Sequence, residues 1–78
     1  MSNDYKEQEF LDKVATRIAE IRRANGVTQE QLAAETGLDR VAIANIEIGR
    51  RRPTVTTIYR LAKGLKVDVT QFFTESRR

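Results

Sequence analysis

The chain has 78 residues, among them 14 Lys or Arg and 11 Asp or Glu, which gives a formal net charge of +3. It contains neither Cys nor His, so disulfides and zinc sites built from Cys and His ligands are excluded. No apolar run approaches the ~18 residues of a membrane-spanning helix, and the polar start "MSNDYKEQEF" is unlike a signal peptide.

The length predicts one domain over residues 1–78, with a core at about 8–74 and ragged ends. The first helix is expected from about Glu7 to Asn25. Its apolar residues recur at spacings of three and four, which predicts one buried stripe made of Phe10, Val14, Ile18 and Ile21. A second helix is expected over Gln29–Thr36, because Thr28 and Gln31 have the spacing of a capping box and a glycine follows.

A third helix is expected from about Arg40 to Ile48, with Asp39 as its N-cap. Ile43 and Ile46 are three residues apart and should share its buried face. A fourth helix is expected from about Val55 to Gly64. The buried face expected for it consists of Val55, Ile58, Leu61, Ala62 and Leu65.

Thr54 is the expected N-cap of the fourth helix, and Asp68 that of a short fifth helix over Val69–Thr74. Phe72 and Phe73 are adjacent, so they cannot lie on the same face of this last helix. We expect one of them to fill the core and the other to be exposed in a monomer and covered in a dimer. The whole pattern predicts an all-α domain.

The second and third expected helices carry a helix-turn-helix pattern. Such a motif needs a tight turn between two steeply crossing helices, and Gly37 supplies a residue that tolerates positive φ. Ala33, four residues earlier, is small enough for the helices to approach closely. Apolar residues are expected at the corner, and the sequence has Leu32, Leu38, Ile43 and Ile46 there.

From Val14 to Phe73 the chain resembles the Cro/C1-type (XRE) helix-turn-helix family of phage repressors and bacterial regulators. The resemblance is carried by "TQEQLAAETGL", "IANIEIGRRRPTVTTIYRLAKGL" and "VDVTQFF". It implies a compact five-helix, lambda repressor-like domain. Within the family, "GLDRVAIANIE" is most similar to the controller proteins of restriction–modification systems, although Val41 and Ala42 stand where those proteins usually have Thr and Tyr.

The outer face of the third helix is the candidate for contacts with DNA bases. If Ile43 and Ile46 are buried, four residues lie mostly outside: Arg40, Val41, Ala44 and Asn45. Arg can bond guanine and Asn adenine in bidentate fashion, while small apolar residues permit close approach and contact thymine methyl groups. The resemblance implies recognition residues at the same positions. The alternative is a helix that packs against another protein.

Phosphate contacts are expected from two places, the start of the second helix and the loop after the third. The expected residues are Thr28, Gln29, Arg50, Arg51 and Arg52. The resemblance implies that Gln29 binds a phosphate and braces the recognition helix. It also implies that Arg22 and Glu47 pair across the core. The alternative for Gln29 is a tolerated first-turn residue without a contact to DNA. The alternative for the Arg loop is a solvated loop, and the alternative for Arg22 and Glu47 is that they are two separate solvated charges.

The sequence contains no catalytic set and no pattern of a ligand-sensing domain, so neither an enzyme nor a cofactor, metal or small-molecule ligand is expected. We expect a cytoplasmic bacterial or phage regulator that binds double-stranded DNA as a homodimer on a partly symmetric operator and controls its own gene. A controller protein would also contact RNA polymerase. The residues expected at the dimer interface are Ile58, Tyr59, Val69, Phe72 and Phe73. The alternative is an antitoxin or another protein-interaction module.

Overall fold

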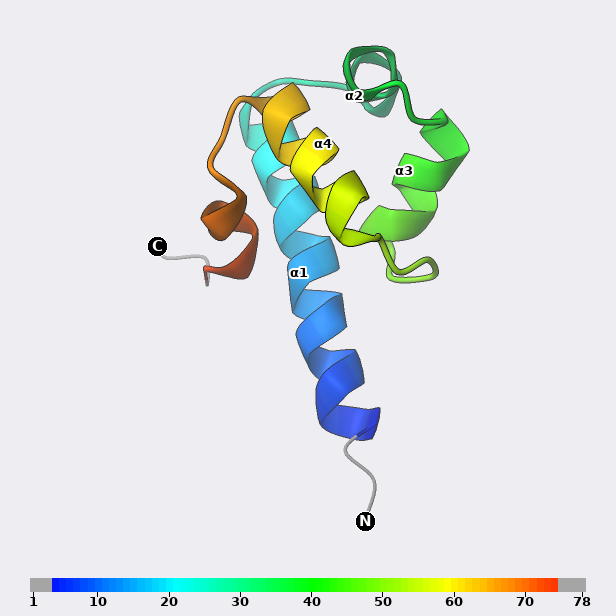
Figure 1. Cartoon of the computed structure of the whole chain (residues 1–78), viewed down its shortest axis with the longest axis vertical. Helices are drawn as coiled ribbons and strands as arrows, with labels where there is room; N and C mark the ends of the chain where they lie inside the picture. The colour runs from blue at the N-terminus through cyan, green and yellow to red at the C-terminus, as the bar shows by residue number, and fades with distance from the viewer. Residues whose placement is uncertain (1–3, 75–78) are drawn as a thin grey trace.

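The computed structural model describes residues 4–74. It consists of four α-helices and a final 3₁₀ helix, and the described part of the chain has no strand (Figure 1). The elements are α1 (Asp4–Ala24), α2 (Gln29–Thr36), α3 (Arg40–Glu47), α4 (Val55–Leu65) and η1 (Val69–Phe73). The all-helical architecture confirms the expectation, but the last element is a 3₁₀ helix and not a fifth α-helix. Within residues 4–74 no helix is both long and apolar enough to cross a membrane.

One core joins all five elements. Its largest fully buried side chains come one from each element: Ile18, Leu32, Ile43, Leu61 and Phe72. The predicted inward faces of α1, α2 and α3 are therefore largely confirmed. Phe72 fills the core and Phe73 is exposed, which confirms that these two neighbours face different ways.

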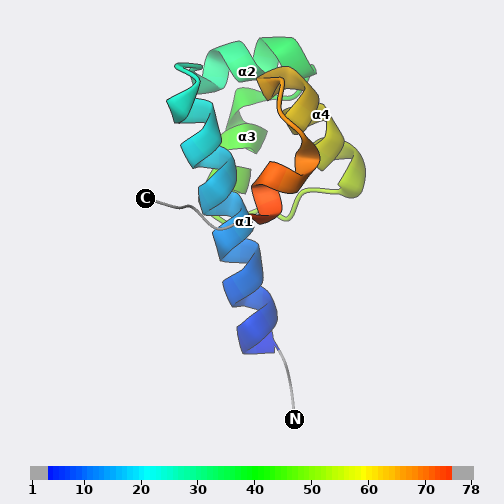
Figure 2. The same ribbon diagram turned by 90° about the vertical axis from the view of Figure 1, so that its left-hand side faces the viewer.

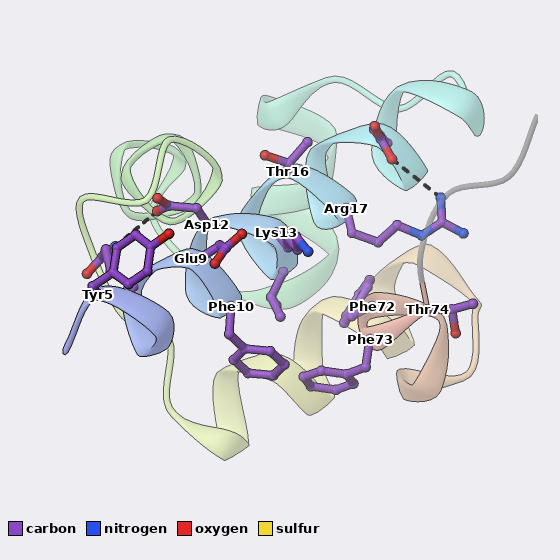
Figure 3. Close-up of a pocket in the computed structure, with 13 residues that line it drawn as sticks. Tyr5, Glu9, Phe10, Asp12, Lys13, Thr16, Arg17, Phe72, Phe73 and Thr74 are labelled. Carbon is purple, nitrogen blue, oxygen red and sulfur yellow. Dashed lines mark hydrogen bonds and ion pairs between the residues drawn. The ribbon is translucent and has the colours of Figure 1, made fainter. Parts of the chain in front are cut away.

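Two residues expected in the core lie outside it. Phe10 is 52% exposed because the N-terminal half of α1 projects past the other helices (Figures 1 and 2). Val55 is 86% exposed because it begins the first turn of α4, where the packed face of that helix has not yet started. Phe10 instead stacks on Phe73, with ring centroids 6.2 Å apart (Figure 3). Apolar spacing thus predicted the helices correctly but not how far the core extends along them.

Most of the predicted caps are present. The Thr28 and Gln31 side chains form the complete capping box of α2, and the Thr54 hydroxyl accepts a hydrogen bond from a backbone N–H of α4. The carboxylate of Asp68 caps η1 through Thr70, whose backbone N–H and hydroxyl both donate to it and so lower the pKa of Asp68. Asp39 occupies the predicted N-cap position of α3, but its side chain is exposed and makes no hydrogen bond to the first turn, so the expected capping bond is absent.

The turn between α2 and α3 is held by two residues. Gly37 adopts the left-handed conformation (φ 76°), and its N–H donates to the Ala33 carbonyl at 2.9 Å. The Thr36 hydroxyl donates to the Leu32 carbonyl at 2.7 Å and accepts the N–H of Leu38 at 3.2 Å. The polar Thr36 therefore ties the end of α2 to the start of the next segment, and this fixes the direction in which α3 leaves the turn.

Gly64 lies inside α4 and does not end it. The helix continues to Leu65, and Lys66 takes the left-handed C-cap position (φ 61°). A Cβ atom placed on Gly64 would lie 2.7 Å from Thr36 Cγ2 and 3.1 Å from Leu32 Cδ1. Gly64 is therefore required because α2 and α4 approach each other closely at this point.

We predict that Gly64→Ala destabilises the protein by about 1–2 kcal/mol, since overpacking outweighs the ~1 kcal/mol that Ala usually gains over Gly in a helix. Urea unfolding followed by circular dichroism measures this. Thr36→Ser removes Cγ2 but keeps the hydroxyl, so the loss caused by Gly64→Ala should be smaller in that background. Equal losses in the two backgrounds would show that the contact with Thr36 is not the cause.

Candidate nucleic-acid interface

The eight residues of α3 divide between the core and the surface. Ala42, Ile43, Ile46 and Glu47 are buried. On the other side Arg40 and Val41 are exposed, Val41 by 53%, while Ala44 and Asn45 are partly exposed. The four residues predicted for base contacts thus lie away from the core. They form a surface with one long cationic side chain, one amide and two small apolar groups.

A bidentate ion pair lies beneath this surface. Arg22 of α1 donates from Nε to Glu47 Oε2 at 2.7 Å and from Nη2 to Glu47 Oε1 at 3.1 Å. The two side chains are only 11% and 4% exposed. Arg22 Nη1 also donates to the carbonyl of Val27 at 2.7 Å. The pair implied by the family resemblance is confirmed, and it joins α1, the loop after it and α3.

The ion pair is connected to the outer face through Gln29, the first residue of α2. Gln29 Nε2 donates to Glu47 Oε1 at 2.9 Å, and Gln29 Oε1 accepts from Arg40 Nη1 at 3.1 Å. Glu30 Oε2 lies 4.0 Å from Arg40 Nε. In residues 4–74 every buried side-chain nitrogen or oxygen has a hydrogen-bond partner.

The resemblance implied that Gln29 braces the recognition helix, but its individual bonds to Glu47 and Arg40 were not predicted. The polar contacts of Arg40 in the described chain are with Gln29 and Glu30, both on α2. The positions of Gln29 and Glu30 could have indicated this contact, because both residues lie in the first turn of α2, and the N-terminus of α2 faces the start of α3. Which first-turn side chain reaches α3 depends on the crossing angle of the helices, and that angle cannot be read from spacing.

The loop after α3 presents the arginine run. Arg50, Arg51 and Arg52 are all exposed, and the backbone N–H groups of the first two donate to the Asn45 carbonyl at 2.9 and 3.1 Å. Arg52 Nη1 lies 3.7 Å from Glu7 Oε2 of α1. The loop backbone is therefore fixed against the end of α3, while its cationic side chains extend into solvent.

Comparison with known proteins agrees with this architecture. Residues 18–72 match the HTH_3 family model, described as "Helix-turn-helix". The chain belongs to this helix-turn-helix family. The match begins in the middle of α1 and ends in η1, so it includes the motif, the ion pair and the arginine loop.

Three relatives illustrate the similarity. The chain is 39% identical over 61 residues to the uncharacterized HTH-type transcriptional regulator y4dJ of Sinorhizobium fredii, which covers 78% of this chain and 79% of that protein. It resembles the restriction–modification controller protein C.AhdI from Aeromonas hydrophila with a TM-score of 0.78, 36% identity and coverage of 81% and 96%. It resembles the controller protein C.Esp1396I, in the crystal structure of a tetramer with its natural 35 base-pair operator, with a TM-score of 0.77, 41% identity and coverage of 82% and 84%.

We predict that Glu47→Ala destabilises the fold by about 3–5 kcal/mol, because it leaves the buried charge of Arg22 without its partner. Glu20→Ala is the matched control: Glu20 lies 3.5 Å from Arg17 in a partly exposed pair, whose side chains are 24% and 40% exposed, and its loss should cost only about 0–1 kcal/mol. Thermal or urea unfolding measures both. Equal losses would contradict the structural role of the buried pair.

Proposed function

We propose that the protein is a sequence-specific DNA-binding transcription regulator that inserts α3 into the major groove. The observation that carries this proposal is the outer face of α3, where Arg40, Val41, Ala44 and Asn45 stand clear of the core. A major groove about 12 Å wide admits a helix whose exposed side chains are few and mostly short. The similar protein C.Esp1396I forms a complex with its natural 35 base-pair operator, which supports DNA binding by this chain.

The four side chains have complementary chemistry for base edges. Arg40 can donate two hydrogen bonds to O6 and N7 of a guanine, and Asn45 can bond N6 and N7 of an adenine. Val41 provides an apolar contact for a thymine methyl group, and Ala44 keeps the backbone of α3 close to the bases. We assign these residues to base recognition.

Phosphate contacts would flank α3 at both ends. The exposed arginines 50–52 follow its C-terminus and can neutralise backbone phosphates without selecting a base. At the other end, the first turn of α2 presents the unpaired N–H groups of a helix N-terminus near Thr28 and Gln29, and such groups favour an anion. The hydroxyl of Thr28 already accepts the N–H of Gln31, so its first role is capping.

A second copy of the chain is the proposed partner in a symmetric complex. Several exposed apolar side chains lie outside α3, among them Val69 and Phe73 of η1 and Tyr59 of α4. The η1 helix lies on a different side of α1 from α3 (Figure 1). Of the predicted interface residues, Tyr59, Val69 and Phe73 are exposed and Ile58 is partly exposed. The prediction that Phe72 lies at the dimer interface is wrong, because its side chain is buried within its own chain. Phe10 joins the surface through its stacking on Phe73 (Figure 3).

The similarity to controller proteins extends the proposal to the biological role. We propose that the dimer controls its own gene from a partly symmetric operator, as the controller protein of a restriction–modification system, and that RNA polymerase is a further partner. The similar proteins C.AhdI and C.Esp1396I are restriction–modification controller proteins, and this similarity supports the controller role.

Selection of binding sites from a random DNA pool, at one fixed salt concentration near physiological, tests the proposed function. We expect a two-fold symmetric motif whose half-sites lie about one helical turn (~34 Å) apart. A motif of this kind would then be sought upstream of the gene itself. Recovery of unenriched DNA would contradict the proposal and direct attention to a protein partner for the same face of α3.

Two arginine variants then separate base recognition from phosphate binding. Arg40→Ala should cost about 1–3 kcal/mol on the selected site and relax the preference at one base pair. Arg51→Ala should weaken binding to all sequences alike. It should also reduce the slope of log affinity against log salt concentration by about one. Titrations with the selected and scrambled sites at several salt concentrations measure both effects. An unchanged preference in Arg40→Ala would show that α3 is placed wrongly on DNA.

The proposed subunit contact predicts that Phe73→Ser shifts the monomer–dimer equilibrium toward monomer, because it removes an exposed aromatic ring from that surface. Sedimentation equilibrium measures the shift. Val41→Ser is the matched control, since Val41 is 53% exposed and Phe73 52%, but Val41 lies on α3. The control should keep the oligomeric state of the wild type. A change in Val41→Ser alone would place the subunit contact on α3 instead.

A further inference from the structure

The N-terminal half of α1 carries an acidic segment beside the arginine loop. Residues 5–12 form this acidic arm, which contains three acidic residues and one lysine. The arm belongs to the part of α1 that projects past the other helices (Figure 1). It also lies outside residues 18–72, which match the family model. Its role is therefore a question about this chain, and the helix-turn-helix motif does not answer it.

Two contacts place carboxylates of the arm against the loop. Glu7 Oε2 lies 3.7 Å from Arg52 Nη1. Further along α1, Asp12 lies over Gly49, since a Cβ atom placed on that glycine would be 2.9 Å from Asp12 Oδ1. The same oxygen accepts a hydrogen bond from Gln8 Nε2 at 3.0 Å. One guanidinium group of the loop and the backbone before it therefore both face acidic side chains of α1.

The arm is held in this place by the rest of its helix. Residues 5–12 are continuous with the second half of α1, where Ile18 is fully buried in the core. Apolar side chains of the two segments also line one cleft of about 200 Å³, Phe10 and Leu11 from the arm and Pro53 from the loop. Because an α-helix is a stiff unit, the position of Glu7 relative to the loop is set by the core.

A phosphate that binds the arginine loop would meet these carboxylates. A charge-assisted hydrogen bond brings its oxygen to about 2.8 Å from a guanidinium nitrogen. A carboxylate only 3.7 Å from Arg52 is then well within the Debye length, which is about 10 Å at 0.1 M salt. DNA must therefore compete with Glu7 for Arg52, and like-charge repulsion opposes the contact. Because phosphate contacts do not select bases, this opposition acts on DNA of every sequence.

We propose that the acidic arm is an autoinhibitory element that weakens binding of the DNA backbone by the arginine loop, with Glu7 as its principal group. The inference rests on the proposed function, since it assumes that the loop binds phosphates. The arm raises the protein concentration at which any DNA, the operator included, becomes occupied. It leaves the base preference of α3 unchanged.

Glu7→Gln tests the proposal, because glutamine keeps the size of the side chain and removes its charge. Glu7 is 56% exposed, so the core is not disturbed. At about 0.1 M salt or below, we expect binding to tighten about 2- to 5-fold on the selected site and on a scrambled site alike, the range expected for an exposed ion pair. The gain should shrink as salt is raised. Binding that is unchanged or weaker at low salt would overturn the proposal.

Glu9→Gln is the matched control. It makes the same change of charge two residues further along α1, but Glu9 lines a different cleft, with Arg17 and Glu20 and without the arginine loop (Figure 3). Its gain in affinity should be clearly smaller than that of Glu7→Gln. Equal gains from the two variants would show that net charge alone is responsible, and the autoinhibitory contact would be refuted. Circular dichroism confirms that each variant is folded.

An Arg52→Ala background tests whether Glu7 acts through its ion pair. Most of the gain from Glu7→Gln should disappear there, because no guanidinium group remains to be released. A full gain without Arg52 would refute the proposed contact. The outcomes separate this inference from the proposed function: a wild-type protein that binds no DNA refutes both, whereas a wild-type protein that binds DNA no more weakly than Glu7→Gln refutes only the role of the arm.

Discussion

The ion pair between Arg22 and Glu47 is the interaction on which the rest of the structure depends. Two charges that are almost fully withdrawn from water are tolerated only when their hydrogen-bonding capacity is met. Here the carboxylate accepts from Arg22 through both oxygens and also from Gln29, and the guanidinium further donates to the Val27 carbonyl. One polar cluster in the core thus joins α1, the loop after it, α2 and α3.

This cluster gives the protein a fixed relation between its core and its outer face. Apolar contacts are not directional, so Ile43 and Ile46 alone would allow α3 to rotate slightly about its axis. The hydrogen bonds of Glu47 are directional and permit much less rotation. Because α3 has only eight residues, the buried Glu47 and the exposed Arg40 lie about two turns apart on one rigid unit. Gln29 connects the two from the neighbouring helix.

The parts of the fold that depend on local chemistry could be predicted from the sequence. The bounds of α2 follow from Thr28, Gln31 and Gly37, all within one short stretch, and they agree with the structure. The parts that depend on distant packing could not. Phe10 and Val55 have the right spacing for a core, but the spacing does not tell where the neighbouring helices end.

The candidate site likewise has features that could be predicted from the sequence and features that could not. The outward placement of Arg40 and Val41 follows from the helical period once Ile43 is buried. The pairing of Arg22 with Glu47 spans 25 residues and was available only through resemblance to a family. The resemblance implied that Gln29 braces the recognition helix, but the identity of Arg40 as its partner there depends on the angle between α2 and α3, which the sequence does not give. Long-range polar contacts of this kind depend on how the helices cross, which local sequence patterns do not determine.

We propose above all that α3 binds base edges while Arg40 keeps its hydrogen bond to Gln29. A crystal structure of the protein with its selected operator tests this most directly. We expect the Arg40 guanidinium within hydrogen-bonding distance of guanine O6 and N7, with the Gln29 amide still between Glu47 and Arg40. A complex in which α3 lies outside the major groove, or in which Gln29 has left Arg40 for a phosphate, would contradict it.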